Sequence, residues 1–348
     1  MVRALIVLVF SGVLLIVLRA MSPLLVPLLQ AAFIGVISLQ PLSWMRRHGV
    51  PRLPAVLVVI LGVTSGIGAI ATVIALSLGD VRSRFPLYQA RFNGLVDEVV
   101  GYLARFQIEV PAQRIEEWLD VSSLLRFTAQ AAQEVGGTLA RGLFVILLVF
   151  FALMEADRQP GILRIVSANA KSYLAQIELF ARQINRYLLI KTWISVGTGI
   201  AAGTLLALIG VEHALLWGVI TFALNFIPTI GSIIAAIPPV VVALLVLGWF
   251  EALLVIILYV LVNILFANLL EPKFLSEGLG MSPVIILVSL ATWGWVFGIT
   301  GVFLAVPLAM MLRAILESSA ETRWLVIFLG LRKAAREPVR ETAVEARA

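Results

Sequence analysis

The side chains best suited to chemistry lie where apolar runs end. Asn263, Asn268 and Glu271 close one such run, and Pro272 and Lys273 follow directly. Asn268 and Glu271 are three residues apart, so an α-helix presents them on one face. A carboxylate at a span end is either a coupling site for protons or cations or a cap at headgroup level paired with Lys273. We favour the cap, because Pro272 ends the helix there.

A second apolar run is interrupted in its interior. It contains Asn225, Pro228, Thr229 and Gly231. Proline lacks the amide N–H and frees backbone carbonyls, which are tolerated at membrane depth only inside protein or beside a wet cavity. Broken helices of this kind form substrate sites in transporters. The alternative is a tight turn at the membrane face.

A third interruption lies at Gly298, Thr300 and Gly301. Glycines at such spacing permit a tight reversal or a close helix contact. We expect the breaks at Pro228–Gly231 and Gly298–Gly301 to line the same path, with Asn225 and Thr300 as hydrogen-bonding groups for a neutral polar solute. Pro228→Ala or Gly231→Leu would then impair passage without changing insertion.

Other residues are interpreted as gating or anchoring positions. Tyr187 and Lys191 are four residues apart and open one span on one face. Lys191 is interpreted as a basic anchor at the cytoplasmic end of its span. The remaining positions of this kind are Pro238, Pro239 and Pro307.

The composition excludes most other classes of function. Hydrophobic residues make up 61% and charged residues 13% of the 348 residues, against about 25% charged in soluble domains, so the main solvent is lipid. No cysteine is present, and His48 and His213 are far apart, so we expect no metal and no cofactor. The basic residues form no aromatic-interleaved patch for nucleic acid. No paired catalytic constellation is visible, so we expect no enzyme.

Charge-free intervals mark the spans, since about 20 apolar residues cross a bilayer. The intervals 214–250 and 278–312 are too long for one span, so each is expected to fold back once. The prediction is an all-α polytopic transmembrane protein with about eight spans plus broken or re-entrant segments. Its expected parts are N-terminal spans 1–79, an extracytoplasmic helical region 80–141, a span 142–154, a cytoplasmic helical segment 155–190, a transport region 191–316 and a basic tail 317–348.

The region 80–141 carries an apolar stripe typical of a helix. Tyr88, Phe92, Leu95 and Val96 recur at helical spacing. Such a stripe packs on the spans, lies in the headgroup layer or joins subunits; we favour packing. The stretch 158–190 also has a helical pattern.

Loop charges predict the orientation in the membrane. Lys and Arg exceed acidic residues by six to three in 155–191 and by seven to five from Arg313 onward, whereas 80–141 has seven against eight. The prediction places both termini in the cytoplasm and 80–141 outside.

The ordered set of motifs in this chain resembles the autoinducer-2 exporter (AI-2E) family, most specifically over 185–315. These motifs are Tyr187-x-x-x-Lys191, Leu216-Trp217-Gly218, Ile227-Pro228-x-x-Gly231, Pro238-Pro239, Glu271-Pro272, Gly298-x-x-Gly301 and Val306-Pro307. The resemblance implies a multi-pass transporter of the bacterial inner membrane, surrounded by lipid and assembled as a homo-oligomer such as a pentamer. It implies export of the quorum-sensing signal autoinducer-2 or cation (sodium)/proton antiport.

The spans hold almost no acidic residues, because Glu251 and Glu271 both stand at span ends. A proton relay needs such groups inside the membrane, so export of a small neutral polar solute is favoured over antiport. Glu271→Gln is expected to keep most transport. A membrane scaffold that carries no solute is the alternative from another class. The sequence does not identify the solute.

The orientation can be tested with single cysteines in this cysteine-free chain. We expect an impermeant thiol reagent on intact spheroplasts to label Asn93→Cys but neither Gln159→Cys nor Thr342→Cys, because the loop charges retain 155–191 and the tail inside. Labelling after permeabilisation is the control for reactivity. Labelling of Gln159→Cys without Asn93→Cys in intact cells would reverse the topology.

Overall fold

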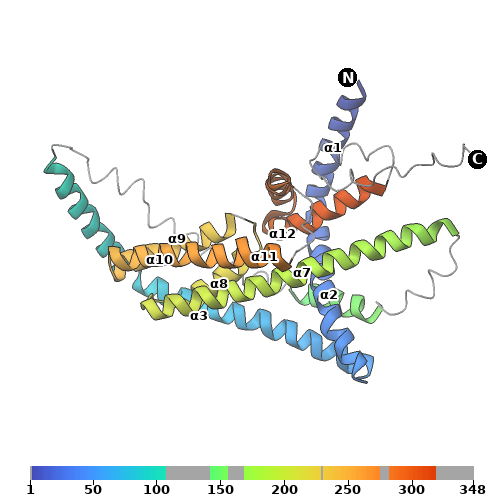
Figure 1. Cartoon of the computed structure of the whole chain (residues 1–348), viewed down its shortest axis with the longest axis horizontal. Coiled ribbons are helices and arrows are strands. Elements are labelled where there is room, and N and C mark those ends of the chain that lie inside the picture. The colour runs from blue at the N-terminus through green and yellow to red at the C-terminus, as the bar shows by residue number, and fades with distance from the viewer. Residues whose placement is uncertain (1, 107–141, 156–167, 229, 275–281, 319–348) are drawn as a thin grey trace, which may run out of the picture. The chain divides into compact units, whose positions relative to one another are not determined.

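The computed structural model describes residues 2–106, 142–155, 168–228, 230–274 and 282–318 (Figure 1). Every regular element in these ranges is a helix, as predicted. The elements are α1 (Val2–Ala20), α2 (Ser22–Arg47), α3 (Arg52–Ala104), the Gly142–Glu155 helix, α7 (Ala168–Ile209), α8 (Ala214–Leu224), α9 (Ile230–Val246), α10 (Trp249–Asn263), the π-helix η1 (Ile264–Leu270), α11 (Glu271–Phe274) and α12 (Pro283–Ser318).

Within these described ranges, five helices are long and apolar enough to cross a membrane. They cover Ser22–Arg47, Arg52–Tyr102, Arg182–Ile209, Trp249–Leu270 and Val284–Leu316. Shorter apolar helices are Gly142–Glu155, α8 and α9. This pattern confirms the predicted polytopic membrane protein.

Two predicted boundaries fall inside continuous helices. The helix α3 continues through residues 79 and 80, and α7 continues through residues 190 and 191. The predicted spans and their extramembrane neighbours are therefore single helices at these points. The helical pattern predicted for 158–190 is confirmed from Ala168 onward, and its cytoplasmic location stays a prediction.

The chain divides into two compact units, which we describe separately. The first comprises Met1–Val26, Val166–Tyr187 and Pro272–Ala348, and the second Pro27–Ile165 and Leu188–Glu271. In the second unit, α2, the start of α3 and the Gly142–Glu155 helix share one buried cluster.

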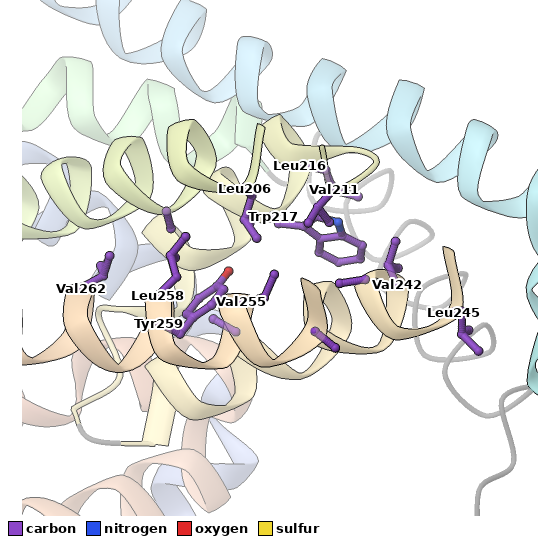
Figure 2. Packing of buried hydrophobic residues seen from close by; sticks show 14 of the residues in the cluster. Leu206, Val211, Leu216, Trp217, Val242, Leu245, Val255, Leu258, Tyr259 and Val262 are labelled. Carbon is purple, nitrogen blue, oxygen red and sulfur yellow. The ribbon is translucent and has the colours of Figure 1, made fainter. Parts of the chain in front are cut away.

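The larger core of the second unit lies among α7, α8, α9 and α10 (Figure 2). Its fully buried side chains include Leu206 and Val255, and the Trp217 ring is 3% exposed. Tyr88 of α3 belongs to this core, and Phe92 and Leu95 pack against it. The prediction that the α3 stripe packs on the spans is confirmed for these residues; the pattern beyond residue 106 lies outside the described ranges.

Polar contacts fix the same part of α3 to two turns. The Arg84 guanidinium and the Tyr88 hydroxyl both donate to the Glu212 carboxylate, at 2.5 and 2.7 Å. Arg91 donates to the Val246 carbonyl at 3.0 Å. The α7–α8 turn and the end of α9 are therefore both held by α3.

The interval 214–250 folds back as predicted. The helix α8 ends at Leu224, and α9 begins at Ile230 and packs against α8. The helix α9 then continues through Pro238 and Pro239, of which Pro239 is buried. Gly248 has a φ of 124° and forms the turn into α10.

The interval 278–312 also reverses, inside α12. Gly298 has non-helical angles of φ 63° and ψ −145°. The Ser289 hydroxyl donates to the Ala305 carbonyl at 2.8 Å across 16 residues, which a straight helix would place about 24 Å apart. The two halves of α12 therefore lie side by side, and the predicted hairpin is confirmed.

Glycines set the distance between α7 and α8. A Cβ atom built on Gly218 would lie 2.9 Å from the Gly199 carbonyl oxygen and 3.0 Å from the Gly203 Cα. The two backbones are thus in direct contact, in the manner of small-residue crossings in membranes. This crossing fixes which face of α7 is turned toward α8.

We expect Gly218→Ala to lower stability by about 1–3 kcal/mol, because the added methyl group has to displace the α7 backbone. The control is Gly62→Ala in α3, where a Cβ meets nothing within 4 Å and alanine favours the helix by up to about 1 kcal/mol. Thermal unfolding in detergent measures both. Equal midpoints for the two variants would contradict the backbone contact.

Candidate functional site

A stripe of buried polar side chains runs along α7. Lys191, Ser195 and Thr198 follow one another at steps of four and three, so they share one helix face. They are 3%, 0% and 3% exposed. Buried polar groups in an otherwise apolar membrane helix are costly and mark functional positions.

Facing helices supply partners for this stripe. The Asn225 side-chain amide, at the end of α8, donates to the Ser195 hydroxyl at 3.0 Å. The Thr221 hydroxyl lies 2.7 Å from the Trp217 carbonyl and 2.9 Å from the Tyr259 hydroxyl. A threonine has one hydroxyl proton, and because that proton goes to the carbonyl, Tyr259 donates to Thr221. We call Lys191, Ser195, Thr198, Thr221, Asn225 and Tyr259 the polar stripe.

Lys191 ends the stripe in an ion pair. Its ammonium lies 2.9 Å from each oxygen of the Glu271 carboxylate. Glu271 keeps 18% of its side chain exposed, whereas Lys191 keeps 3%. The carboxylate partner is therefore Lys191 and not Lys273, whose side chain is exposed.

This ion pair also corrects the interpretation of Lys191 as a basic anchor. An anchoring lysine extends its ammonium to the interface, but Lys191 is buried and turned into the helix bundle. Its neighbour Tyr187, one turn earlier on the same face, is 5% exposed. The basic residue at this span end is part of the site.

The π-helix η1 explains how Glu271 reaches Lys191. The Glu271 amide donates to the Phe266 carbonyl, five residues back, whereas an α-helix bonds four residues back. Pro272 disfavours α geometry in the turn that precedes it. A glycine opposite leaves room for the widened turn, since a Cβ on Gly197 would lie 2.6 Å from the Phe266 ring.

The π geometry also separates Asn268 from Glu271. The prediction that these two share a helix face is wrong, because it assumed α spacing. Asn268 is exposed, while Glu271 is half-buried against Lys191. Asn263, at the end of α10, is half-buried.

The Pro228–Gly231 break is a compact turn. The Ile230 amide donates to the Pro228 carbonyl at 2.7 Å, and the Gly231 amide donates to the Ile227 carbonyl at 3.2 Å. A Cβ on Gly231 would lie 1.9 Å from the Leu224 carbonyl oxygen. Only glycine fits there, so Gly231→Leu is now expected to fail through lost folding rather than through transport alone. Thr229 lies outside the described residues.

The second break belongs to the first unit. Gly298 forms the reversal, and a Cβ on Gly301 would lie 1.8 Å from the Trp293 carbonyl oxygen. Thr300 is half-buried, and Pro307 is buried inside α12. That this break and Pro228–Gly231 line one path stays a prediction.

Sequence reasoning identified Asn225, Lys191 and Glu271 but missed the rest of the stripe. One signal was available for α7, since Lys191, Ser195 and Thr198 recur at helical spacing within an apolar run. Thr221 and Tyr259 gave no such signal, because a threonine and a tyrosine 38 residues apart meet only in the folded chain, where α8 and α10 both pack on α9.

The comparisons with known proteins decide the family. The sequence matches the family model described as AI-2E family transporter over residues 5–321. The chain belongs to this family. It is similar to the AI-2 transport protein TqsA of Escherichia coli K12, with 31% identity over 93% of this chain and 95% of that protein. It is also similar to the putative transport protein YhhT of Escherichia coli K12, with 30% identity over 90% and 89%, and to a putative transport protein of Haemophilus influenzae, with 31% over 94% of each.

Membership in the AI-2E family agrees with the predicted resemblance and with the helices described above. The protein is a multi-pass membrane transporter, and the family is one of transporters rather than of enzymes. The polar stripe therefore lies in the interior of a transport protein.

We expect Glu271→Gln to destabilise this AI-2E transporter by about 3–5 kcal/mol, because it leaves the Lys191 charge buried without its counter-charge. The double variant Lys191→Met with Glu271→Gln should regain most of that loss, since it removes both charges. Thermal unfolding in detergent measures each form. A Glu271→Gln midpoint equal to that of the parent chain would mean that Lys191 is not held by this pair.

Proposed function

We propose that this AI-2E family transporter exports a small, neutral, polar solute across the bacterial inner membrane, with autoinducer-2 as the first compound to test. The observation that carries the proposal is the buried polar stripe of the second unit. The name of the relative TqsA, an AI-2 transport protein, supports the choice of compound.

The stripe has the chemistry that a neutral solute needs. Ser195, Thr198, Thr221 and Tyr259 offer hydroxyl groups and Asn225 an amide, and these groups are bonded to each other or to backbone carbonyls. A solute with hydroxyl or carbonyl groups can exchange partners with them, so that no group loses its hydrogen bond. The only charged member, Lys191, is already neutralised by Glu271.

The proposed direction is export, and the orientation that the loop charges predict says which end of the stripe a leaving solute meets first. Both termini are cytoplasmic, and the Lys191 end of the stripe faces the cytoplasm while the α7–α8 turn at Glu212 faces outside. A solute that leaves the cell enters at Lys191. The protein acts as a homo-oligomer surrounded by lipid; exposed apolar side chains such as Leu208 and Trp249, 78% and 74% exposed, support contact with lipid or with further copies.

Cation/proton antiport is the second function, and the ion pair is the observation that favours it. Glu271 and Lys191 are ionisable groups inside an apolar bundle, and such groups serve as proton relays in transporters. Protonation of Glu271 would release Lys191 and so couple the pair to a proton. A scaffold without transport activity is the remaining alternative.

We expect Asn225→Leu to reduce autoinducer-2 efflux from loaded proteoliposomes by about tenfold, because the Ser195 hydroxyl loses its partner and the solute loses one too. Ser43→Ala is the control, since Ser43 is exposed on α2, and it should leave the flux unchanged. Flux is expressed per folded protein, with the size-exclusion profile as the measure of folding.

The parent chain distinguishes the three functions in the same vesicles. Efflux of autoinducer-2 without sodium-dependent proton movement supports the proposal. Proton movement driven by a sodium gradient, read with an internal pH dye, would replace the proposal with antiport. Absence of both fluxes would favour the scaffold.

A further inference from the structure

The two ends of the polar stripe are covered by different kinds of side chain. Beyond Thr198 the same face of α7 continues with Ala202 and Leu206, both fully buried in the apolar core. One turn before Ser195, the same face presents Lys191, whose ammonium forms an ion pair with the Glu271 carboxylate. One end is therefore closed by apolar packing and the other by two opposite charges.

The charged closure is held by a segment with two possible geometries. The segment after α10 contacts α7 twice, through Phe266 of η1 against Gly197 and through Glu271, the first residue of α11, on Lys191. Both contacts depend on the π turn between them, in which the Glu271 amide bonds five residues back. Conversion of that turn to α geometry rotates residue 271 by roughly 100° relative to α10. The carboxylate would then leave Lys191.

The two partners differ in how easily they can move. Glu271 keeps 18% of its side chain exposed and Lys191 keeps 3%. Glu271 can be hydrated as it leaves, which lowers the cost of separating a buried pair, whereas Lys191 stays inside with its three donors uncovered. Departure of the carboxylate would leave the ammonium uncovered, and the next member of the stripe is Ser195, one turn farther along α7.

We propose that the Lys191–Glu271 ion pair is a gate at the end of the polar stripe, closed by the π geometry of η1 and opened when that turn relaxes. The gate rests on the proposed function, since it controls entry to the stripe that the solute uses. Under the proposed topology it faces the cytoplasm. The two charges act as positioning residues for the stripe rather than as the solute site.

The test reads access to the stripe without any transported solute. Ser195→Cys places a reporter at a fully buried position in a chain that has no other cysteine. The probe is a charged methanethiosulfonate reagent added to inverted membrane vesicles. Labelling should be slow in the closed parent and roughly tenfold or more faster with Glu271→Gln, because loss of the paired charge shifts the equilibrium toward the open state.

Three further variants separate a gate from a general loss of structure. The exchanged pair Lys191→Glu with Glu271→Lys should restore slow labelling. Pro272→Ala keeps both charges but removes the bias against α geometry, and it should raise the labelling of Ser195→Cys. A second reporter, Ala202→Cys at the apolar closure, should stay unlabelled with Glu271→Gln.

Each contrary result overturns the gate. Unchanged labelling of Ser195→Cys with Glu271→Gln would show that the ion pair does not control access. Unchanged labelling with Pro272→Ala would show that the π turn does not hold the ion pair closed. Equal acceleration at Ala202→Cys would show that the pair only stabilises the fold. The labelling needs no solute, so it tests the gate independently of the proposed function. If labelling behaves as expected but autoinducer-2 does not cross the membrane, the proposed solute is wrong and the gate stands.

Discussion

The ammonium of Lys191 lies within a helix bundle whose core is mostly apolar, and it is 3% exposed. A charge in such surroundings is tolerated only beside a counter-charge with satisfied hydrogen bonds. Glu271 supplies both carboxylate oxygens at 2.9 Å. To bring it there, the chain after Asn263 forms a π-helix for seven residues. The Phe266 ring occupies the space that a side chain at Gly197 would need.

Backbone contact constrains the same helix on another side. Gly199 and Gly203 bring α7 against Gly218 of α8, so no side chain separates the two helices at that level. This close approach turns the face with Ser195 toward Asn225. Charge pairing and glycine contact together fix the rotation of α7, and the polar stripe is the result.

The α7–α8 turn and the end of α9, which lie away from Lys191, are bound by α3. Arg84 and Tyr88 both bind Glu212 in the α7–α8 turn, and Arg91 binds the end of α9. Under the proposed gate, the second unit rearranges near Lys191 while these contacts keep its opposite end fixed. Such an arrangement suits a transporter, in which access to a buried path has to change at one end at a time.

The sequence alone predicted the all-α membrane class and the two reversals, and it favoured packing of the α3 stripe on the spans over a place in the headgroup layer or between subunits, because each depends on local signals. Long charge-free runs give spans, Gly298 and Pro228 give turns, and the spacing of Tyr88, Phe92 and Leu95 gives an apolar face. Only the tertiary structure decided the partners of the polar groups. Lys191 and Glu271 are 80 residues apart, and their pairing depends on a π turn whose spacing no α-helical pattern predicts. The sequence pattern made Lys191 an anchor and gave Glu271 to Lys273, and only the packing of the helices made Lys191 and Glu271 partners.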